Sequence, residues 1–210
     1  EKPVFNPKAG RLMDFSVSQK QGATFMYVLP TSTTKALVEY TLFSPRVLEK
    51  ETYVTALKKY IKEDLKIDNY TIEHEEFGVI PMSLAKFEKT SKPHVINLGT
   101  SGGFTKASTG YTFQFIQKNV AEIVNNLEVG KRPNPSTAFK DKVYQWYDRT
   151  LLDVLLTKKL TGKEVFTKIF QRIPAKKILA FLGNESTLSE DISIMKSLPL
   201  KPFLGSGIKQ

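Results

Sequence analysis

Three short segments near the start of the chain have residue patterns typical of β-strands, and one of them, Ala23–Leu29, is apolar on both faces. The alternation from Arg11 to Ser18 predicts a half-buried β-strand. The segments Ala23–Leu29 and Lys35–Phe43 predict two further strands, and only short polar turns separate the three. Because short connections join strands that lie side by side and run in opposite directions, this part is expected to form an antiparallel meander.

Spacings of three and four between apolar residues, typical of helices, appear after the third strand. They predict an amphipathic helix over residues 51–65 and a helix over residues 108–127. Between the two helices we expect a fourth strand over residues 70–82 and a short buried strand over residues 94–98. After a Pro- and Gly-rich hinge at 128–136 the pattern is helical only, over residues 137–159, 163–173, 174–182 and 189–196. We therefore expect an α+β fold, with a mixed, largely antiparallel sheet followed by a helical C-terminal tail.

Composition narrows the chemistry that the protein can use. The 210 residues include no cysteine, which excludes disulfide scaffolds, thiol nucleophiles, iron–sulfur clusters and zinc–thiolate sites. Neither of the two histidines, His74 and His94, sits in an H-E-x-x-H pattern, so no metal site is expected. No apolar stretch is long enough to predict a transmembrane helix.

The net charge of +10 is concentrated in the second half of the chain. Residues 128–210 contain 15 basic and 8 acidic residues, a net charge of +7. Such a surface suits acidic lipid headgroups, nucleic acid or solvent alone. The stripe Phe166, Ile169, Phe170 and Ile173, which is edged by lysines, fits either a membrane interface or core packing. Because no nucleic-acid motif is present, we do not expect nucleic acid as a partner.

A glycine-rich turn follows the short strand at 94–98. Glycines in such a turn let backbone N–H groups approach a phosphate or a ring oxygen, although a purely structural strand–turn–helix explains them equally well. A second group at the start of the following helix would supply cap hydroxyls and one more glycine. The candidate ligand-binding residues in the two groups are Gly99, Thr100, Ser101, Gly102, Gly103, Ser108, Thr109 and Gly110.

Glu39 is the one acidic residue of the third predicted strand, and its neighbours are largely apolar. A carboxyl group that apolar neighbours desolvate stays protonated near neutral pH and can act as a proton donor. The alternative is an ordinary glutamate on the solvated face of the sheet. Periodicity alone does not decide between the two.

Three stretches in this order resemble motifs of the flavin-dependent lycopene cyclases of bacteria and plants. The first stretch combines Phe25–Pro30 with Leu37–Thr41, and it is similar to the family's F-x-Y-x-x-P and aliphatic-x-Glu-acidic-Thr motifs. The second, Glu76–Met82, is similar to G-x-I-P-M. The third, Gly99–Tyr111, is similar to G-T-A-G followed by P-S-T-G-Y. The closing segments 181–182 and 198–203 also fit, so the resemblance covers essentially the whole chain.

The resemblance implies a flavoprotein fold related to the aromatic hydroxylases. In that fold residues 1–93 form a substrate-binding sheet with one helix, residues 94–127 return to the flavin site, and residues 128–210 form the helical C-terminal region. Glu39 matches the glutamate held to be catalytic in a ring closure of lycopene, or a related acyclic carotene, without net redox change. The resemblance also implies FAD as cofactor and a cytoplasmic location, peripheral on the inner face of a membrane.

The sequence departs from the family pattern at two places. Tyr40 replaces the acidic residue that often follows the catalytic glutamate, and Lys106-Ala107 stands where many members have His-Pro. The dinucleotide fingerprint G-x-G-x-x-G is absent. We therefore expect part of a larger enzyme that alone neither holds FAD tightly nor cyclises a carotene. The alternative is a non-catalytic isoprenoid- or membrane-binding module derived from a flavoprotein.

Overall fold

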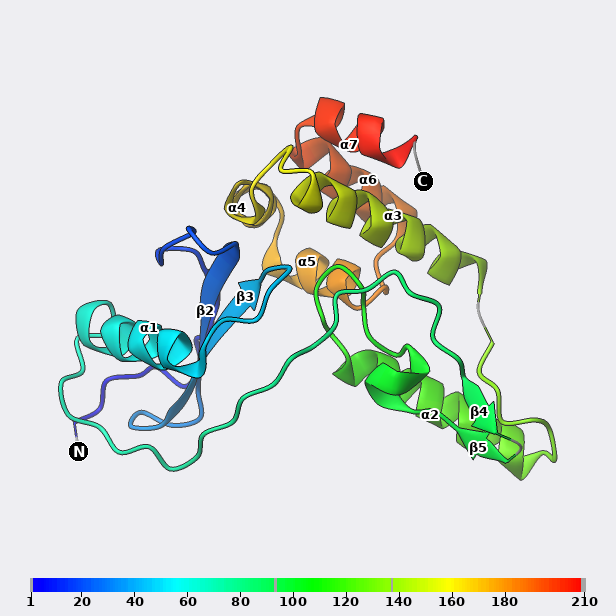
Figure 1. The fold of residues 1–210 in the computed structure, drawn as a ribbon, viewed down its shortest axis with the longest axis horizontal. Coiled ribbons are helices and arrows are strands. Elements are labelled where there is room, and N and C mark those ends of the chain that lie inside the picture. Colours follow the sequence, from blue (N-terminus) through cyan, green and yellow to red (C-terminus); the bar gives the residue numbers. More distant parts are fainter. Residues whose placement is uncertain (1, 93, 137, 209–210) are drawn as a thin grey trace. The chain divides into compact units, whose positions relative to one another are not determined.

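The computed structural model describes residues 2–92, 94–136 and 138–208 (Figure 1). It is an α+β structure, as predicted, with small antiparallel sheets and seven α-helices among the described residues. The chain divides into two compact units, and each is described by itself below. The first contains Glu1–Val79 and Thr161–Thr167, and the second contains Ile80–Leu160 and Lys168–Gln210. The predicted division at residues 93 and 127 stays a prediction, and residue 93 itself lies outside the described residues.

The first unit is built on a three-stranded antiparallel sheet in the order β1–β2–β3, which confirms the predicted meander. Its strands are β1 (Arg11–Asp14), β2 (Ala23–Pro30) and β3 (Ala36–Phe43). The strand pairs in the described part of the chain are all antiparallel, so the parallel pairing that a mixed sheet requires does not occur there. Tyr27 of β2 lies directly opposite Glu39 of β3.

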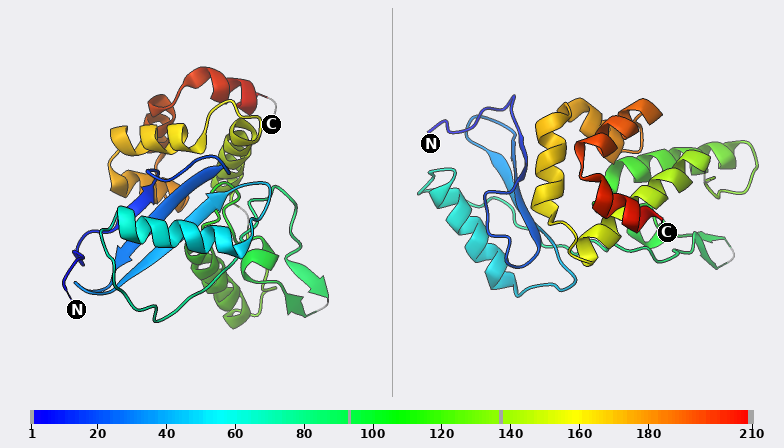
Figure 2. Two further views of the ribbon diagram at one scale, coloured as in Figure 1. Left: turned by 60° about the vertical axis from the view of Figure 1, so that its left-hand side comes forward. Right: turned by 90° about the horizontal axis from the view of Figure 1, so that it is seen from above.

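Helix α1 (Lys50–Glu63) covers one face of this sheet (Figure 2). Met26 and Val28 of β2 and Tyr60 of α1 are buried together in the core between the two layers. The predicted helix over residues 51–65 is therefore confirmed, with slightly shifted ends. Successive residues of a strand point to opposite faces, so Phe25, Tyr27 and Leu29 of β2 belong to the face that α1 does not cover.

The strand predicted over residues 70–82 is wrong. These residues are extended but pair with no other strand, although side chains fix part of the segment to the first unit. Lys35 Nζ lies 2.6 Å from Glu73 Oε1, and Lys50 Nζ lies 2.8 Å from Glu75 Oε1. Alternation alone was misleading because a strand also needs a partner for its backbone hydrogen bonds, and the side chains here are mostly exposed.

The second unit begins with a two-stranded sheet of β4 (Thr90–Lys92) and β5 (Val95–Ile96). A short strand does form within the predicted range 94–98. The prediction that this strand is buried is wrong, since Val95 is 45% exposed. The 3₁₀-helix η1 (Gly99–Gly102) follows, and then α2 (Phe113–Glu128). Helix α2 begins at Phe113 rather than at Ser108, because residues 106–111 form a tight turn in which the N–H of Lys106 donates to the carbonyl of Tyr111 at 2.8 Å.

The C-terminal half is helical, as predicted. Its helices are α3 (Phe139–Leu156), α4 (Gly162–Arg172), α5 (Ala175–Leu182), α6 (Leu188–Ser197) and α7 (Leu200–Gly207). Thr137, where the first of these was predicted to begin, lies outside the described residues. The sequence pattern did not predict α7.

The apolar stripe of α4 is core rather than membrane surface. Phe166 is 3% exposed and Ile169 is 6% exposed. Phe166 contacts two aromatic rings of the first unit, with centroid distances of 6.0 Å to Phe15 and 6.3 Å to Phe43. The core-packing interpretation of this stripe is therefore confirmed, and the membrane interpretation of Phe166 and Ile169 is wrong.

One buried hydroxyl fixes α1 to β1, and its removal is expected to destabilise the first unit. Tyr60 Oη donates to Asp14 Oδ2 at 2.6 Å and accepts from Arg11 Nη1 at 2.9 Å. A hydrogen bond to a charged group contributes roughly 1.5–3 kcal/mol. We therefore expect Tyr60→Phe to lower the free energy of unfolding by about 2 kcal/mol in urea titrations, whereas Tyr70→Phe, at a residue 44% exposed, should have little effect.

The pH dependence gives a second test of the same contact. Burial, together with the hydrogen bond to Asp14, raises the pKa of Tyr60 to about 12. The folded chain thus keeps a proton that the unfolded chain loses near pH 10, so the stabilisation is complete below pH 10 and declines as the pH rises toward 12. The loss of stability between pH 10 and 12 should be smaller in Tyr60→Phe than in the unaltered protein. Equal losses would contradict this assignment.

Candidate functional site

The face of the β2–β3 pair that α1 does not cover is an almost entirely apolar surface with one carboxylate on it. Glu39 lies in the middle of β3, and Leu37 precedes it by two residues on the same face. Opposite these residues, β2 places Tyr27 against Glu39 and Leu29 against Leu37. Leu37 is 49% exposed and Leu29 is 36% exposed, so apolar surface next to the carboxylate is open.

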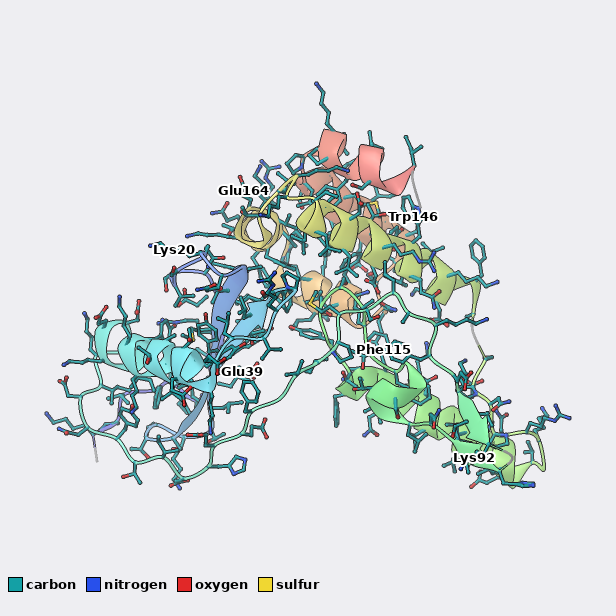
Figure 3. All side chains as sticks on the ribbon, in the orientation of Figure 1. Lys20, Glu39, Lys92, Phe115, Trp146 and Glu164 are labelled. Atoms are coloured by element: carbon teal, nitrogen blue, oxygen red, sulfur yellow. The ribbon has the colours of Figure 1, made fainter. Side chains whose placement is uncertain are left out.

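Glu39, labelled in Figure 3, is exposed, as expected of a glutamate on a solvated face of the sheet and not of a carboxyl group that apolar neighbours desolvate. A neighbour on its own strand orients its carboxylate. Thr41 Oγ1 donates to Glu39 Oε1 at 2.7 Å. At the other end of the same face, Phe25 is fully buried and packs edge-on against Tyr27 and Phe43, with ring centroids 5.3 Å and 5.2 Å away. Along this face, the aromatic end at Phe25 is therefore closed, Glu39 lies in the middle, and the aliphatic end at Leu29 and Leu37 is open.

The glycine-rich turn forms η1 and has two residues in the left-handed region, Gly99 with φ 60° and Gly103 with φ 74°. The protein's own atoms explain part of its glycine content. A Cβ at Gly102 would collide with the carbonyl oxygen of Asn97, and one at Gly103 would lie 3.0 Å from Phe87 Cβ. The start of the turn remains available to a ligand, because the first N–H groups of a 3₁₀-helix have no acceptor within the helix and Ser101 is exposed.

Ser108, Thr109 and Gly110 do not cap a helix, contrary to the sequence-based expectation. They lie in the tight turn before α2 and are buried. Ser108 Oγ donates to Asp148 Oδ1 of α3 at 2.6 Å. Gly110, with φ 75°, sits against the side chain of Ile80. Their part in ligand binding stays a prediction, and these contacts show that they anchor the turn within the second unit.

Lys106, which sequence reasoning treated only as a departure from the family pattern, is the centre of a buried polar cluster. Its side chain is 1% exposed, and its Nζ lies 2.7 Å from Asp148 Oδ1 and 2.8 Å from Asn184 Oδ1. The same Nζ lies 5.3 Å from the centroid of the Tyr144 ring and 5.8 Å from that of Phe181. Burial lowers the pKa of Lys106, and the carboxylate of Asp148 opposes that effect.

A second buried network lies beside this cluster in the helical region. Tyr144 Oη lies 2.7 Å from Ser186 Oγ, and Ser186 Oγ donates to Asp191 Oδ1 at 2.5 Å. Burial raises the pKa of Tyr144 to about 12. Ser186 is 1% exposed and Asp191 is 4% exposed, so a substrate cannot reach this network, and its role is to join α3 to the start of α6.

Other features of the described residues add no second candidate site. The described part of the chain contains no group of three or more acidic, histidine or cysteine residues that could hold a metal ion. A pocket of about 380 Å³ in the first unit lies between the N-terminal segment and the end of α1, and it contains none of the predicted site residues. Glu39 belongs to the first unit and Gly99–Gly110 to the second.

Replacing Lys106 tests whether the buried cluster stabilises the second unit. Loss of one partner of a buried ion pair leaves an uncompensated charge and costs about 3–5 kcal/mol, which is the decrease in the free energy of unfolding that we expect for Lys106→Met. Adding Asp148→Asn removes the remaining charge and should restore part of that stability. Lys118→Met is the matched control, because Lys118 is 70% exposed and lies 4.0 Å from Asp141.

Urea unfolding of the three variants gives the measurement. The control should lose no more than about 1 kcal/mol, as is usual for exposed pairs. A Lys106→Met protein as stable as Lys118→Met, or a double variant less stable than Lys106→Met, would show that the buried pair does not have this role.

Comparison with known proteins places these sites in a family. The chain matches the family model described as lycopene cyclase protein over residues 1–206. It is 25% identical over 215 residues to the lycopene beta-cyclase of Paracoccus sp. (strain N81106 / MBIC 01143). The aligned region covers 94% of this chain and 53% of that relative. The chain thus spans about half the length of the curated relative that it matches. No solved structure is a significant match. Because the family model covers nearly every residue, the protein belongs to the lycopene cyclase family.

Proposed function

We propose that the protein acts in carotenoid biosynthesis, in the closure of a ring at the end of lycopene or a related acyclic carotene, with Glu39 as the acid. The observation that carries this proposal is the position of Glu39 on an open apolar face in a chain of the lycopene cyclase family. A carotene is a hydrocarbon, so it favours a surface such as that of Leu29 and Leu37 over water. The carboxyl group of Glu39, in its protonated form, would be the proton donor close to a bound chain.

The proposed reaction is an isomerisation. The carboxyl proton of Glu39 adds to the terminal carbon–carbon double bond and leaves a carbocation. The π electrons of a second double bond attack the cation and form the new ring bond, and a proton then leaves a neighbouring carbon, so that no atom is gained or lost. Thr41, which donates to Oε1, holds the carboxyl group in place and leaves Oε2 to carry the proton. Because Glu39 is exposed in this structure, the carotene bound against Leu29 and Leu37 would have to displace the water that would otherwise quench the cation.

FAD is the cofactor that the family implies, and some of the residues expected to bind it suit that role. The start of η1, where Thr100 is half-buried and Ser101 is exposed, suits hydrogen bonding from the N–H groups of these two residues to the polar edge of a flavin ring. Ser108, Thr109 and Gly110 fit less well because they are buried in internal contacts. The chain contains no G-x-G-x-x-G segment for the pyrophosphate. When bound, reduced FAD would stabilise the cation or handle a proton.

We further propose that the fold is that of a flavoprotein related to the aromatic hydroxylases, with the β1–β2–β3 sheet as the roof of the carotene site. Because carotenes dissolve in lipid, the protein would work as a peripheral protein on the cytoplasmic face of a membrane. The net charge of +7 on residues 128–210 supports a surface with acidic headgroups. The described helices include none that is long and apolar enough to span a bilayer.

Replacing Glu39 tests the proposed acid. The protein is expressed from its complete reading frame in a lycopene-accumulating bacterium, and cyclic and acyclic carotenes are measured by chromatography. Loss of a general acid lowers a rate by roughly 10²–10⁴-fold, so Glu39→Gln should abolish detectable ring formation. Glu63→Gln, which changes an exposed glutamate of α1 in the same unit, should leave ring formation unchanged.

Immunoblots would confirm equal amounts of each variant. Unchanged ring formation in Glu39→Gln would refute the acid role. A wild-type protein that binds lycopene without forming rings would instead favour the non-catalytic isoprenoid-binding module.

A further inference from the structure

The fully buried residues of helix α7 are the small Ser206 and Gly207, whereas Pro202 and Phe203 are half-buried. Ser206 and Gly207 are buried against α3. Trp146 Nε1 donates to the carbonyl oxygen of Gly207 at 3.0 Å, and a Cβ on Gly207 would lie 2.8 Å from the indole ring, so only glycine fits there. Ser206 Oγ accepts from Lys159 Nζ at 2.7 Å and donates to Asp153 Oδ2 at 2.5 Å. These contacts hold the C-terminal end of α7 against α3.

The side that points away carries a stripe of large aliphatic residues. Leu200, Leu204 and Ile208 follow one another at intervals of four, which places them on one side of the helix. They are 55%, 59% and 86% exposed. A helix of a folded protein normally turns such a stripe toward the core. The stripe of α7 faces outward instead, which indicates that this surface contacts an apolar environment outside the unit.

The charges around the stripe are positive. Lys201 on α7 and Lys196 on the last turn of α6 are both exposed. No acidic residue follows Asp191 in the sequence. Asp153 is the carboxylate that contacts α7 from α3, and Lys159 neutralises it at 3.0 Å. The stripe therefore combines an apolar surface with a basic rim.

An anionic lipid surface matches both properties at once. Amphipathic helices that bind in the membrane interface place aliphatic residues at the boundary of the acyl chains and lysines among the headgroups. A second copy of this chain fits less well, because face-to-face contact of two such stripes would bring their lysine rims together. The indole of Trp146, which is 42% exposed beside α7 (Figure 3), adds an aromatic group of the kind enriched at membrane interfaces.

We propose that α7 is the membrane-docking element of the protein, with Leu200, Leu204 and Ile208 in the interface of an anionic bilayer and Lys196 and Lys201 on its headgroups. This inference refines the peripheral membrane location proposed above by naming the surface that makes the contact. It does not depend on Glu39, because docking and acid catalysis use different residues in different units.

Vesicle co-sedimentation of the full chain tests the proposal. The probes are vesicles of phosphatidylcholine with phosphatidylglycerol and vesicles of phosphatidylcholine alone. We expect binding to the anionic vesicles that weakens when salt is raised from about 0.1 M to about 0.5 M. The double substitution L200Q/L204Q should weaken binding by about tenfold or more. Leu127→Gln, at a leucine of α2 that is 56% exposed in the same unit, is the matched control and should bind normally.

Three results would overturn the proposal: no binding of the unaltered protein, equal loss of binding in L200Q/L204Q and Leu127→Gln, or equal binding to neutral and anionic vesicles. A dimer in sedimentation velocity that L200Q/L204Q dissociates, without vesicle binding, would assign the stripe to a second copy and also overturn it. Glu39→Gln serves to separate the two proposals, because it should still bind vesicles even though ring formation is lost.

Discussion

The ion pair between Lys106 and Asp148 lies where three segments of the second unit meet. Lys106 belongs to the turn before α2, Asp148 to α3, and Asn184, which accepts a further hydrogen bond from Lys106, follows α5. Burying two charges is costly unless their remaining hydrogen bonds are also satisfied. Ser108 donates a hydrogen bond to Asp148 and Asn184 accepts one from Lys106, so that requirement is met. The aromatic rings of Tyr144 and Phe181 lie next to the ammonium group of Lys106. The glycine-rich segment is thereby held close to the helical region through its own turn.

In the first unit α1 covers one face of the sheet, and on the other face Phe166 of α4 packs only against the aromatic end at Phe15 and Phe43. Because α1 buries Met26 and Val28 on one face, the residues between them in sequence must lie on the other face. That second face needs no acidic residue for folding, yet Glu39 stands in its middle and Thr41 orients the carboxylate. Glu39 therefore owes its position to the packing of its neighbours and not to contacts of its own with the core.

Local patterns predicted much of the fold but not the contacts between distant segments. Runs of strand-forming residues between short turns predicted β2 and β3 nearly to the residue, because short turns force such strands to pair with each other. Alternation failed at residues 70–82, where no neighbouring strand completes the hydrogen bonds. The position of Glu39 on β3 was predictable, whereas its solvent exposure depends on what covers the sheet. Lys106 was not identified because its partners, Asp148 and Asn184, come close only in the folded chain.

The helices α4 and α7 show why a stripe edged by lysines does not by itself reveal its environment. In α4 the stripe around Phe166 and Ile169 is buried, and in α7 the stripe of Leu204 is open. The difference lies in what each helix packs against. Phe166 of α4 contacts the rings of Phe15 and Phe43, whereas α7 contacts α3 through Ser206 and Gly207, which are small enough for close packing. These contacts leave the aliphatic stripe of α7 exposed.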